Sequence, residues 1–319
     1  MNNHLKIVAL SANKEMANAI AKDLGVKVIQ TTVKRFADGE MIFEAQESFR
    51  GDNIYIIQST CPPVTDRLME LLLCIDACKR ASAKSITCVM PYFGYARQDR
   101  KAKPRQPISA KLVADMLEVA GADHIVSSDL HAPQLAGFFS IPIDDISPIP
   151  SFASHFAKMN LQDVVCVTPD HGGFARASRL AERLDAPIAV IDKRRPEPNK
   201  AEIFSVVGDV KDKTCIIVDD IVDTAGTLLA AVDKLYELGA KKVYAAVTHG
   251  VLSGDAIERI NASQLEKLII TDSIPLREDK MNGKIEIIHL HALFAKILSA
   301  LEEGKSLHEV HQNYLKENA

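Results

Sequence analysis

Short apolar runs alternate with amphipathic helical stretches along the whole chain, and this alternation constrains the fold more than any other feature. The runs are rich in Val and Ile and bounded by polar residues, Gly or Pro, which is typical of buried parallel strands. The clearest are residues 54–57, 86–90, 124–126, 164–167, 188–191, 215–218 and 243–247. Helical stretches cover residues 66–81, 109–120 and 227–238. The pattern predicts an α/β protein whose mostly parallel sheets are flanked by helices.

The chain length predicts two domains, since 319 residues exceed the roughly 150 of a typical domain. Residues 141–151, IPIDDISPIPS, contain three prolines and little periodicity, which favours a boundary there. We therefore expect an N-terminal domain over residues 1–147 and a C-terminal domain over residues 148–319, similar in kind. Residues 291–301 have helical spacing, and the sequence leaves open on which domain they pack.

Composition argues against several classes of protein. No apolar run approaches the roughly 18 residues that cross a bilayer, and the N-terminus lacks the basic segment and apolar core of a signal peptide. A formal net charge of -4 argues against a protein that coats nucleic acid. The six cysteines form no CxxC pair and lie mostly in apolar runs, so we expect buried free thiols in a reducing compartment. These features predict a cytoplasmic protein that binds neither membrane nor nucleic acid.

Basic residues are concentrated in two short stretches. Lys193, Arg194 and Arg195 are consecutive, and the other stretch contains Arg97, Arg100, Lys101, Lys103 and Arg105. In a mildly acidic chain, such clusters indicate pockets for a small polyanion, although each alone is equally compatible with a solvated loop.

The strongest local signal is in residues 215–232, CIIVDDIVDTAGTLLAAV. An apolar strand ends in two carboxylates, Asp219 and Asp220, at the edge where parallel sheets bind ligands. Backbone N–H groups at the following helix start can bind phosphate oxygens, and the two carboxylates can accept hydrogen bonds from vicinal sugar hydroxyls, with or without a cation. The loop between strand and helix consists of Asp223, Thr224, Ala225, Gly226 and Thr227. The alternative to a ligand-binding loop is an ordinary acidic turn between a strand and a helix.

Residues 218–227, VDDIVDTAGT, resemble the phosphoribosyl-binding loop of the type I phosphoribosyltransferase fold. That loop is shared by transferases that consume phosphoribosyl diphosphate and by the synthetase that makes it. Five further segments resemble the synthetase family, the ribose-phosphate diphosphokinases, and their spacing matches from the first strand to about residue 300. They are FADGE (36–40), PYFGYARQDR (91–100), SSDLHA (127–132), TPDHGG (168–173) and IDKRRP (191–196).

The resemblance implies transfer of the diphosphoryl group of Mg-ATP to the C1 hydroxyl of ribose 5-phosphate, with one or two Mg²⁺ ions. It also implies the role of each matching residue. For ATP these are Phe36, Asp38, Gly39, Glu40, Arg97, Gln98 and Asp99. For ribose 5-phosphate they are Arg195, Asp219, Asp220, Asp223, Thr224, Ala225, Gly226 and Thr227.

The resemblance places His131 and Asp170 near the magnesium that bridges the ATP phosphates. Because Mg²⁺ prefers oxygen ligands, the residue chemistry favours Asp170 as the ligand. It leaves open whether His131 donates to a phosphate oxygen or is structural.

Lys193 and Arg195 are the candidates for catalysis. Diphosphoryl transfer spreads negative charge over equatorial oxygens, so catalysis is mostly positioning and cationic stabilisation. Lys193 supplies a mobile point charge and Arg195 a planar fork. An exposed hairpin is the alternative for this basic, proline-punctuated stretch.

The family also implies a homohexamer in which the 36–40 loop completes a neighbouring subunit's active site, with activation by inorganic phosphate and inhibition by ADP. Residues 144–147 and the tail after residue 301 depart from the family pattern, which puts the ADP response in doubt.

Two other functions stay open at this point. A phosphoribosyltransferase acting on a base would need no ATP-binding segments, and a non-catalytic regulatory relative would carry altered catalytic loops.

Overall fold

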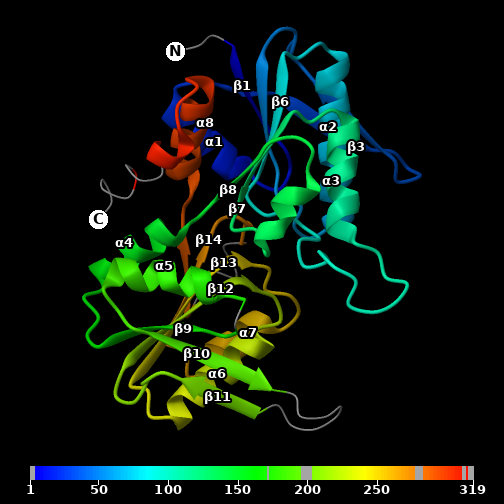
Figure 1. Ribbon diagram of the computed structural model, residues 1–319. Coiled ribbons are helices and arrows are strands. Elements are labelled where there is room, and N and C mark those ends of the chain that lie inside the picture. The colour runs from blue at the N-terminus through cyan, green and yellow to red at the C-terminus, as the bar shows by residue number, and fades with distance from the viewer. Residues whose placement is uncertain (1–3, 171, 195–202, 277–282, 311–313, 315–319) are drawn as a thin grey trace. The chain divides into compact units, whose positions relative to one another are not determined.

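The computed structural model describes residues 4–170, 172–194, 203–276, 283–310 and 314, with only the backbone of 192–194, 203 and 204. The chain divides into two compact units (Figure 1). The first comprises Met1–Ser147, Ser273–Pro275 and His289–Gln312. The second comprises Pro148–Asp272, Leu276–Ile288 and Asn313–Ala319.

The first unit is built on a six-stranded parallel sheet in the order β2-β1-β5-β6-β7-β8. Its strands are rich in Ile and Val, which pack well on a pleated surface buried on both faces. The strands are β1 (Leu5–Ala9), β2 (Val28–Ile29), β5 (Asn53–Ile57), β6 (Ser85–Met90), β7 (His124–Ser128) and β8 (Ile143–Ile146). The helical segments are α1 (Lys14–Leu24), α2 (Val64–Arg80), α3 (Ser109–Ala120), η1 (Pro133–Phe138) and α8 (His291–Glu302). An antiparallel hairpin, β3 (Thr31–Arg35) and β4 (Met41–Ala45), forms a separate sheet.

The second unit contains a seven-stranded sheet in the order β11-β10-β9-β12-β13-β14-β15, parallel except for the edge strand β11. The strands are β9 (Val164–Thr168), β10 (Ile188–Arg194), β11 (Ile203–Val207), β12 (Thr214–Val222), β13 (Lys242–Gly250), β14 (Lys267–Thr271) and β15 (Ile285–Ile288). The helices are α4 (Ile149–Lys158), α5 (Phe174–Leu184), α6 (Gly226–Glu237) and α7 (Ala256–Ala262).

The two sheets share one strand order. In the first unit the chain adds β2 on one side of β1 and later returns to add β5 on the other side. In the second unit β10 and β12 flank β9 in the same way. The point where the order reverses therefore falls between β1 and β5 and between β9 and β12, and open α/β sheets bind ligands beyond the carboxyl ends of strands at such a point.

The predicted α/β class with mostly parallel sheets is confirmed, and α3 occupies the predicted residues 109–120. One strand differs in a way that matters. The apolar run 215–218 lies in the first half of β12, which continues to Val222 because Asp219 pairs with Val247 of β13 and Val222 with Gly250. The sheet therefore holds both carboxylates, Asp219 and Asp220, within its last ladder positions.

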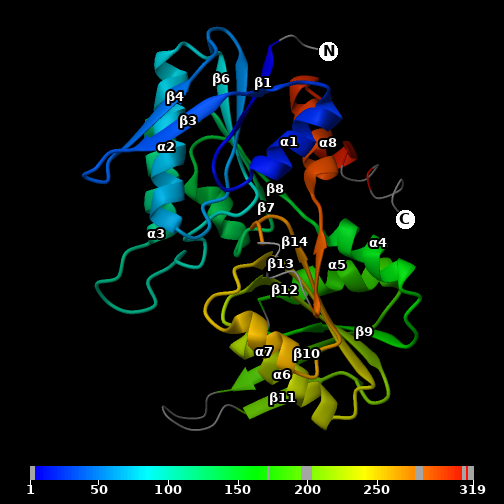
Figure 2. The same ribbon diagram turned by 180° about the vertical axis from the view of Figure 1, so that it is seen from behind.

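The division into units differs from the expected continuous domain over residues 148–319, because α8 belongs to the first unit. Figures 1 and 2 show α8 beside α1 from both sides. At the start of α8, His291 pairs with Asp23 at 2.7 Å. At its end, Glu302 accepts hydrogen bonds from Asn53 at 3.0 Å and from the Tyr55 hydroxyl at 2.8 Å. These contacts, with the buried apolar side of α8, hold the helix on the first sheet.

All six cysteines are buried and free, as predicted. Among the described residues, no helix is both long enough and apolar enough to cross a membrane.

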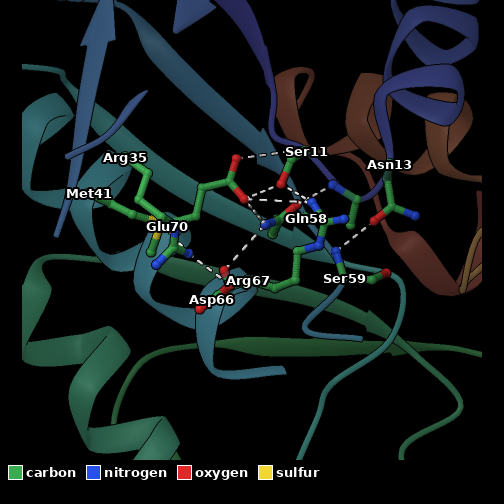
Figure 3. Close-up of polar contacts among 10 residues, drawn as sticks. Ser11, Asn13, Arg35, Met41, Gln58, Ser59, Asp66, Arg67 and Glu70 are labelled. Atoms are coloured by element: carbon green, nitrogen blue, oxygen red, sulfur yellow. Dashed lines mark hydrogen bonds and ion pairs between the residues drawn. The ribbon is translucent and has the colours of Figure 1, made fainter. Parts of the chain in front are cut away.

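A polar cluster around Glu70 of α2 lies at the carboxyl ends of β1 and β5 (Figure 3). The Glu70 carboxylate is 3% exposed and accepts hydrogen bonds from the Ser11 N–H at 3.0 Å, the Ser11 hydroxyl, and the Gln58 amide at 2.9 Å. Arg67, one turn earlier on α2, lies 3.8 Å from the same carboxylate. A buried charge is tolerated when it is paired and hydrogen-bonded, so this cluster ties α2 to the ends of both strands.

We predict that Glu70→Gln lowers the free energy of unfolding by about 1–3 kcal/mol, because the new amide donors face donors of Ser11 and Gln58. Urea denaturation followed by circular dichroism measures the change. The matched control is Asp76→Asn on the same helix, whose carboxylate pairs with Arg80 at the surface and should leave the midpoint nearly unchanged. Equal midpoints for Glu70→Gln and wild type would show that the cluster does not stabilise the unit.

Candidate functional site

The second unit brings several of the predicted site residues to one edge of its sheet. β9 lies between β10 and β12, with Thr168 opposite Val190 and Val167 opposite Ile217. Since these strands are parallel, the residues that follow each register position meet at the carboxyl edge. This edge carries Lys193 on β10, Asp170 after β9, and Asp219, Asp220 and the 223–227 loop on and after β12.

The 223–227 loop turns the chain from β12 directly into α6. Ala225 precedes the helix with a φ of 61°, in the left-handed region, and its side chain is buried. α6 has no side-chain N-cap, so its first N–H groups face the loop. Thr224 and Thr227 are exposed and add hydroxyl groups. Together these groups place several hydrogen-bond donors at a helix N-terminus, which is suited to a phosphate group.

Arg259 of α7 supports this loop, and sequence reasoning missed it. Its guanidinium donates a hydrogen bond of 2.9 Å to the Thr224 carbonyl oxygen. Its other terminal nitrogen would lie 4.0 Å from a Cβ atom added at Gly226. A cation therefore lies beside the loop backbone, where it adds positive potential to that of the helix start.

Asp219 and Asp220 form a pair of adjacent carboxylates near the end of β12, with Asp219 half-buried and Asp220 buried. Burial raises the pKa of Asp219 well above the usual carboxyl range, and the neighbouring Asp220 raises this pKa further. The Asp220 N–H donates to the Asp219 carboxylate at 2.9 Å. Arg176 of α5 lies 3.8 Å from the Asp220 carboxylate. The charge of the pair is thus partly compensated. Its carboxylate oxygens can accept hydrogen bonds from vicinal hydroxyl groups.

Asp170 has an exposed carboxylate in a fixed orientation after β9. Its Oδ1 atom accepts a hydrogen bond from the Gly173 N–H at 2.9 Å, and its carbonyl oxygen accepts one from the Thr168 hydroxyl at 2.6 Å. Within the described residues, no group of three or more His, Cys, Asp or Glu side chains could hold a metal. A single oriented carboxylate fits Mg²⁺ that is bound largely by phosphates and water.

The first unit carries the predicted ATP residues on two separate elements. Arg97, Gln98 and Asp99 follow β6, where the Gln98 side chain accepts a hydrogen bond from the Ser109 hydroxyl at 2.6 Å. Asp99 accepts one of 2.8 Å from Gln134 of η1. That bond joins the segment after β6 to the turn after β7, which contains the exposed His131.

The predicted ATP-binding residues 36–40 form the tip of the β3–β4 hairpin. The tip is closed by a hydrogen bond of 2.8 Å from the Phe36 N–H to the Glu40 carbonyl, and Asp38 accepts one of 3.0 Å from the Glu40 N–H. Arg35 reinforces the base of the tip, since it donates to the Gly39 carbonyl at 2.8 Å and pairs with Asp66 of α2 at 2.8 Å. The Phe36 ring is 52% exposed, so this tip presents a flat aromatic face to solvent.

The catalytic candidates are described only in part. The backbone of Lys193 lies in β10 opposite Phe204 of β11, and its side chain is outside the description. Arg195 lies outside the described residues.

Two family models match separate parts of the chain. Residues 5–121 match the family model of the N-terminal domain of ribose phosphate pyrophosphokinase, and residues 195–312 match the phosphoribosyl synthetase-associated domain. A ribose-phosphate pyrophosphokinase of Oceanobacillus iheyensis is 53% identical over 303 residues, covering 95% of this chain and 96% of the relative. One from Bacillus subtilis is 51% identical over 304 residues, covering 95% and 96%.

A solved structure agrees with these relatives. The phosphoribosylpyrophosphate synthetase of Mycobacterium smegmatis is 41% identical, with a TM-score of 0.89 over 95% of this chain and 100% of that chain.

We predict that Asp219→Asn stabilises the ligand-free protein at pH 8 more than at pH 5. Because the pKa of Asp219 is raised in the folded state, the folded protein binds more protons, and stability is lost as the pH rises above about 4 toward the raised pKa. Thermal melts of wild type and variant at both pH values measure this difference. The control is Asp233→Asn, an exposed position on α6. Identical pH dependence in wild type and Asp219→Asn would contradict the prediction.

Proposed function

Since the chain belongs to the ribose-phosphate pyrophosphokinase family, we propose that it transfers the diphosphoryl group of Mg-ATP to the C1 hydroxyl of ribose 5-phosphate, giving 5-phosphoribosyl 1-diphosphate and AMP. The observation that carries this proposal is the shared sheet edge of the second unit. There a helix N-terminus with small and hydroxyl-bearing residues lies next to two adjacent carboxylates and a third, oriented one.

In the proposed complex the 5-phosphate of the sugar lies in the 223–227 loop. The N–H groups of the loop and of the α6 start, with the hydroxyls of Thr224 and Thr227, donate to its oxygens. Asp219 and Asp220 accept hydrogen bonds from the ring hydroxyls. These contacts fix the sugar at two ends, so the orientation of the C1 hydroxyl is determined before reaction.

In the transfer step, the C1 hydroxyl oxygen attacks the β-phosphorus of ATP in line. The new O–Pβ bond forms while the bond from Pβ to the oxygen that joins it to the α-phosphate breaks. That oxygen leaves on AMP with the electron pair, and the hydroxyl proton passes to water. We assign Lys193 and Arg195 to the negative charge that develops on the transferring group, because cations placed there act mainly on the transition state. Arg195 also contacts ribose 5-phosphate in this proposal.

Magnesium, as one or two ions, would neutralise phosphate charge when bound with ATP. The oriented carboxylate of Asp170 is the protein oxygen that we assign to it, and His131 is the second candidate ligand, from the first unit. The small number of carboxylates suits Mg²⁺, which keeps several waters and takes substrate phosphates as ligands.

ATP is assigned to the first-unit residues Arg97, Gln98 and Asp99 and to the 36–40 hairpin tip. Phe36 is half-exposed on a hairpin that Arg35 holds in place, so its ring is available to contact another subunit. We propose that it completes the ATP site of a neighbouring subunit within a homohexamer. Activation by inorganic phosphate belongs to the same proposal, as does a cytoplasmic location, which the six free thiols support.

The decisive test is incubation of the protein with ATP labelled at the β-phosphate and with ribose 5-phosphate. We expect the label on the sugar and release of AMP. Label that stays on the nucleotide, with turnover appearing only when phosphoribosyl diphosphate and a free base are added, would favour a phosphoribosyltransferase instead. An absence of both reactions would favour a non-catalytic regulatory relative.

We predict that Lys193→Ala lowers kcat by about 10²–10³-fold, the loss typical of one transition-state charge partner. Affinities for ATP and ribose 5-phosphate, measured by calorimetry, should change little because the charge acts on the transferring group. Lys241→Ala, an exposed lysine on the same unit, is the control. Near-normal turnover of Lys193→Ala would reject the assignment.

A further inference from the structure

Arg176, on the first turn of α5, is an arginine whose side chain is only 12% exposed. Its Nη1 atom lies 3.8 Å from Oδ1 of Asp220, and the Asp220 side chain is 8% exposed. A nearly buried ion pair of this kind requires favourable geometry, because both charges have lost most of their water. α5 follows β9, whereas Asp220 lies on β12, so the pair joins two adjacent strand ends.

Gly173 shows how close the guanidinium lies to the Asp170 turn. A Cβ atom added at Gly173 would lie 3.8 Å from Arg176 Nη1, 3.8 Å from Asp170 Oδ1 and 2.6 Å from the Thr168 hydroxyl. A larger residue would therefore collide with the Thr168 side chain, and glycine lets the turn pass beside the cation. Arg176 thus stands between the turn that carries Asp170 and the strand end that carries the two acids.

Arg176 partly balances the charge of the acidic pair. Burial and mutual repulsion both raise the pKa of Asp219, and Arg176 is the cation that lowers it. A guanidinium also differs from an ammonium group, since its planar fork fixes the orientation of a carboxylate as well as its charge.

We propose that Arg176 is a positioning residue for ribose 5-phosphate, holding the Asp220 carboxylate in the orientation in which it accepts hydrogen bonds from the ring hydroxyls. This inference rests on the proposed function for its substrate. Arg176 acts through Asp220 and not on the reacting phosphorus, so its loss affects sugar binding before it affects the transfer step.

The primary experiment compares Arg176→Gln, Arg176→Lys and the control Arg179→Gln. Arg179 is exposed and lies about one turn further along α5. We expect Arg176→Gln to raise the KM for ribose 5-phosphate by about tenfold, as when a buried carboxylate loses a charged partner, with little change in the KM for ATP. Arg176→Lys should restore part of the loss, and Arg179→Gln should match wild type.

A double-mutant cycle tests whether Arg176 acts through the carboxylate. In an Asp220→Asn background, Arg176→Gln should cause little further loss of ribose 5-phosphate affinity. Affinity is measured by calorimetry without ATP, and melting temperatures of all variants identify any that fail to fold. Fully additive losses would overturn the inference, as would an unchanged affinity of folded Arg176→Gln or an equal rise in the KM for ATP.

Calorimetry also separates this inference from the proposed function. If wild type binds ribose 5-phosphate but transfers no diphosphoryl group, the proposed reaction fails while the binding cycle still decides the role of Arg176. If wild type does not bind the sugar phosphate at all, both fail.

Discussion

The candidate site depends on two adjacent carboxylates held at the buried end of a strand. Pairing of β12 with β13 continues past the apolar part of the strand as far as Val222, so Asp219 and Asp220 are drawn into the sheet. Burying like charges side by side costs free energy, and the raised pKa of Asp219 expresses that cost. Arg176 offsets part of it, and hydroxyl donors of a bound sugar would offset more. This unfavourable free energy is therefore located where a bound ligand can reduce it.

The first unit has the same strand order but no such pair of carboxylates. Its counterpart of β12 is β5, which leads into Gln58 and Ser59, a neutral amide and a neutral hydroxyl. The nearby carboxylate of Glu70 already accepts hydrogen bonds from Ser11 and Gln58. The two strand ends in the same topological position thus differ, because the Glu70 carboxylate is satisfied by its own neighbours while the acidic pair has only partial charge compensation from Arg176. Fold alone would not have distinguished them.

Local sequence patterns carried most of the fold and the central loop. Alternating apolar runs and helical periodicity predicted the parallel sheets, and α3 began and ended as expected. The carboxylates and the small loop residues were visible because they are consecutive in sequence. Arg176 and Arg259 were not found, since each acts on a residue more than thirty positions away and a lone arginine in a helix gives no local signal. The placement of α8 was left open for the same reason, because its partners lie near the other end of the chain.

The return of α8 to the first unit has a consequence for how this protein can be divided. The chain passes from one unit to the other at residues 147–148, 272–273, 275–276, 288–289 and 312–313. A single cut near residue 147 would therefore yield an N-terminal fragment that lacks the helix covering α1, with the acceptors of Asn53 and Tyr55 removed. Neither unit is therefore encoded by one continuous stretch of the sequence. Exchange of one complete unit between two relatives would therefore need several crossovers, because a single one would separate α8 from α1.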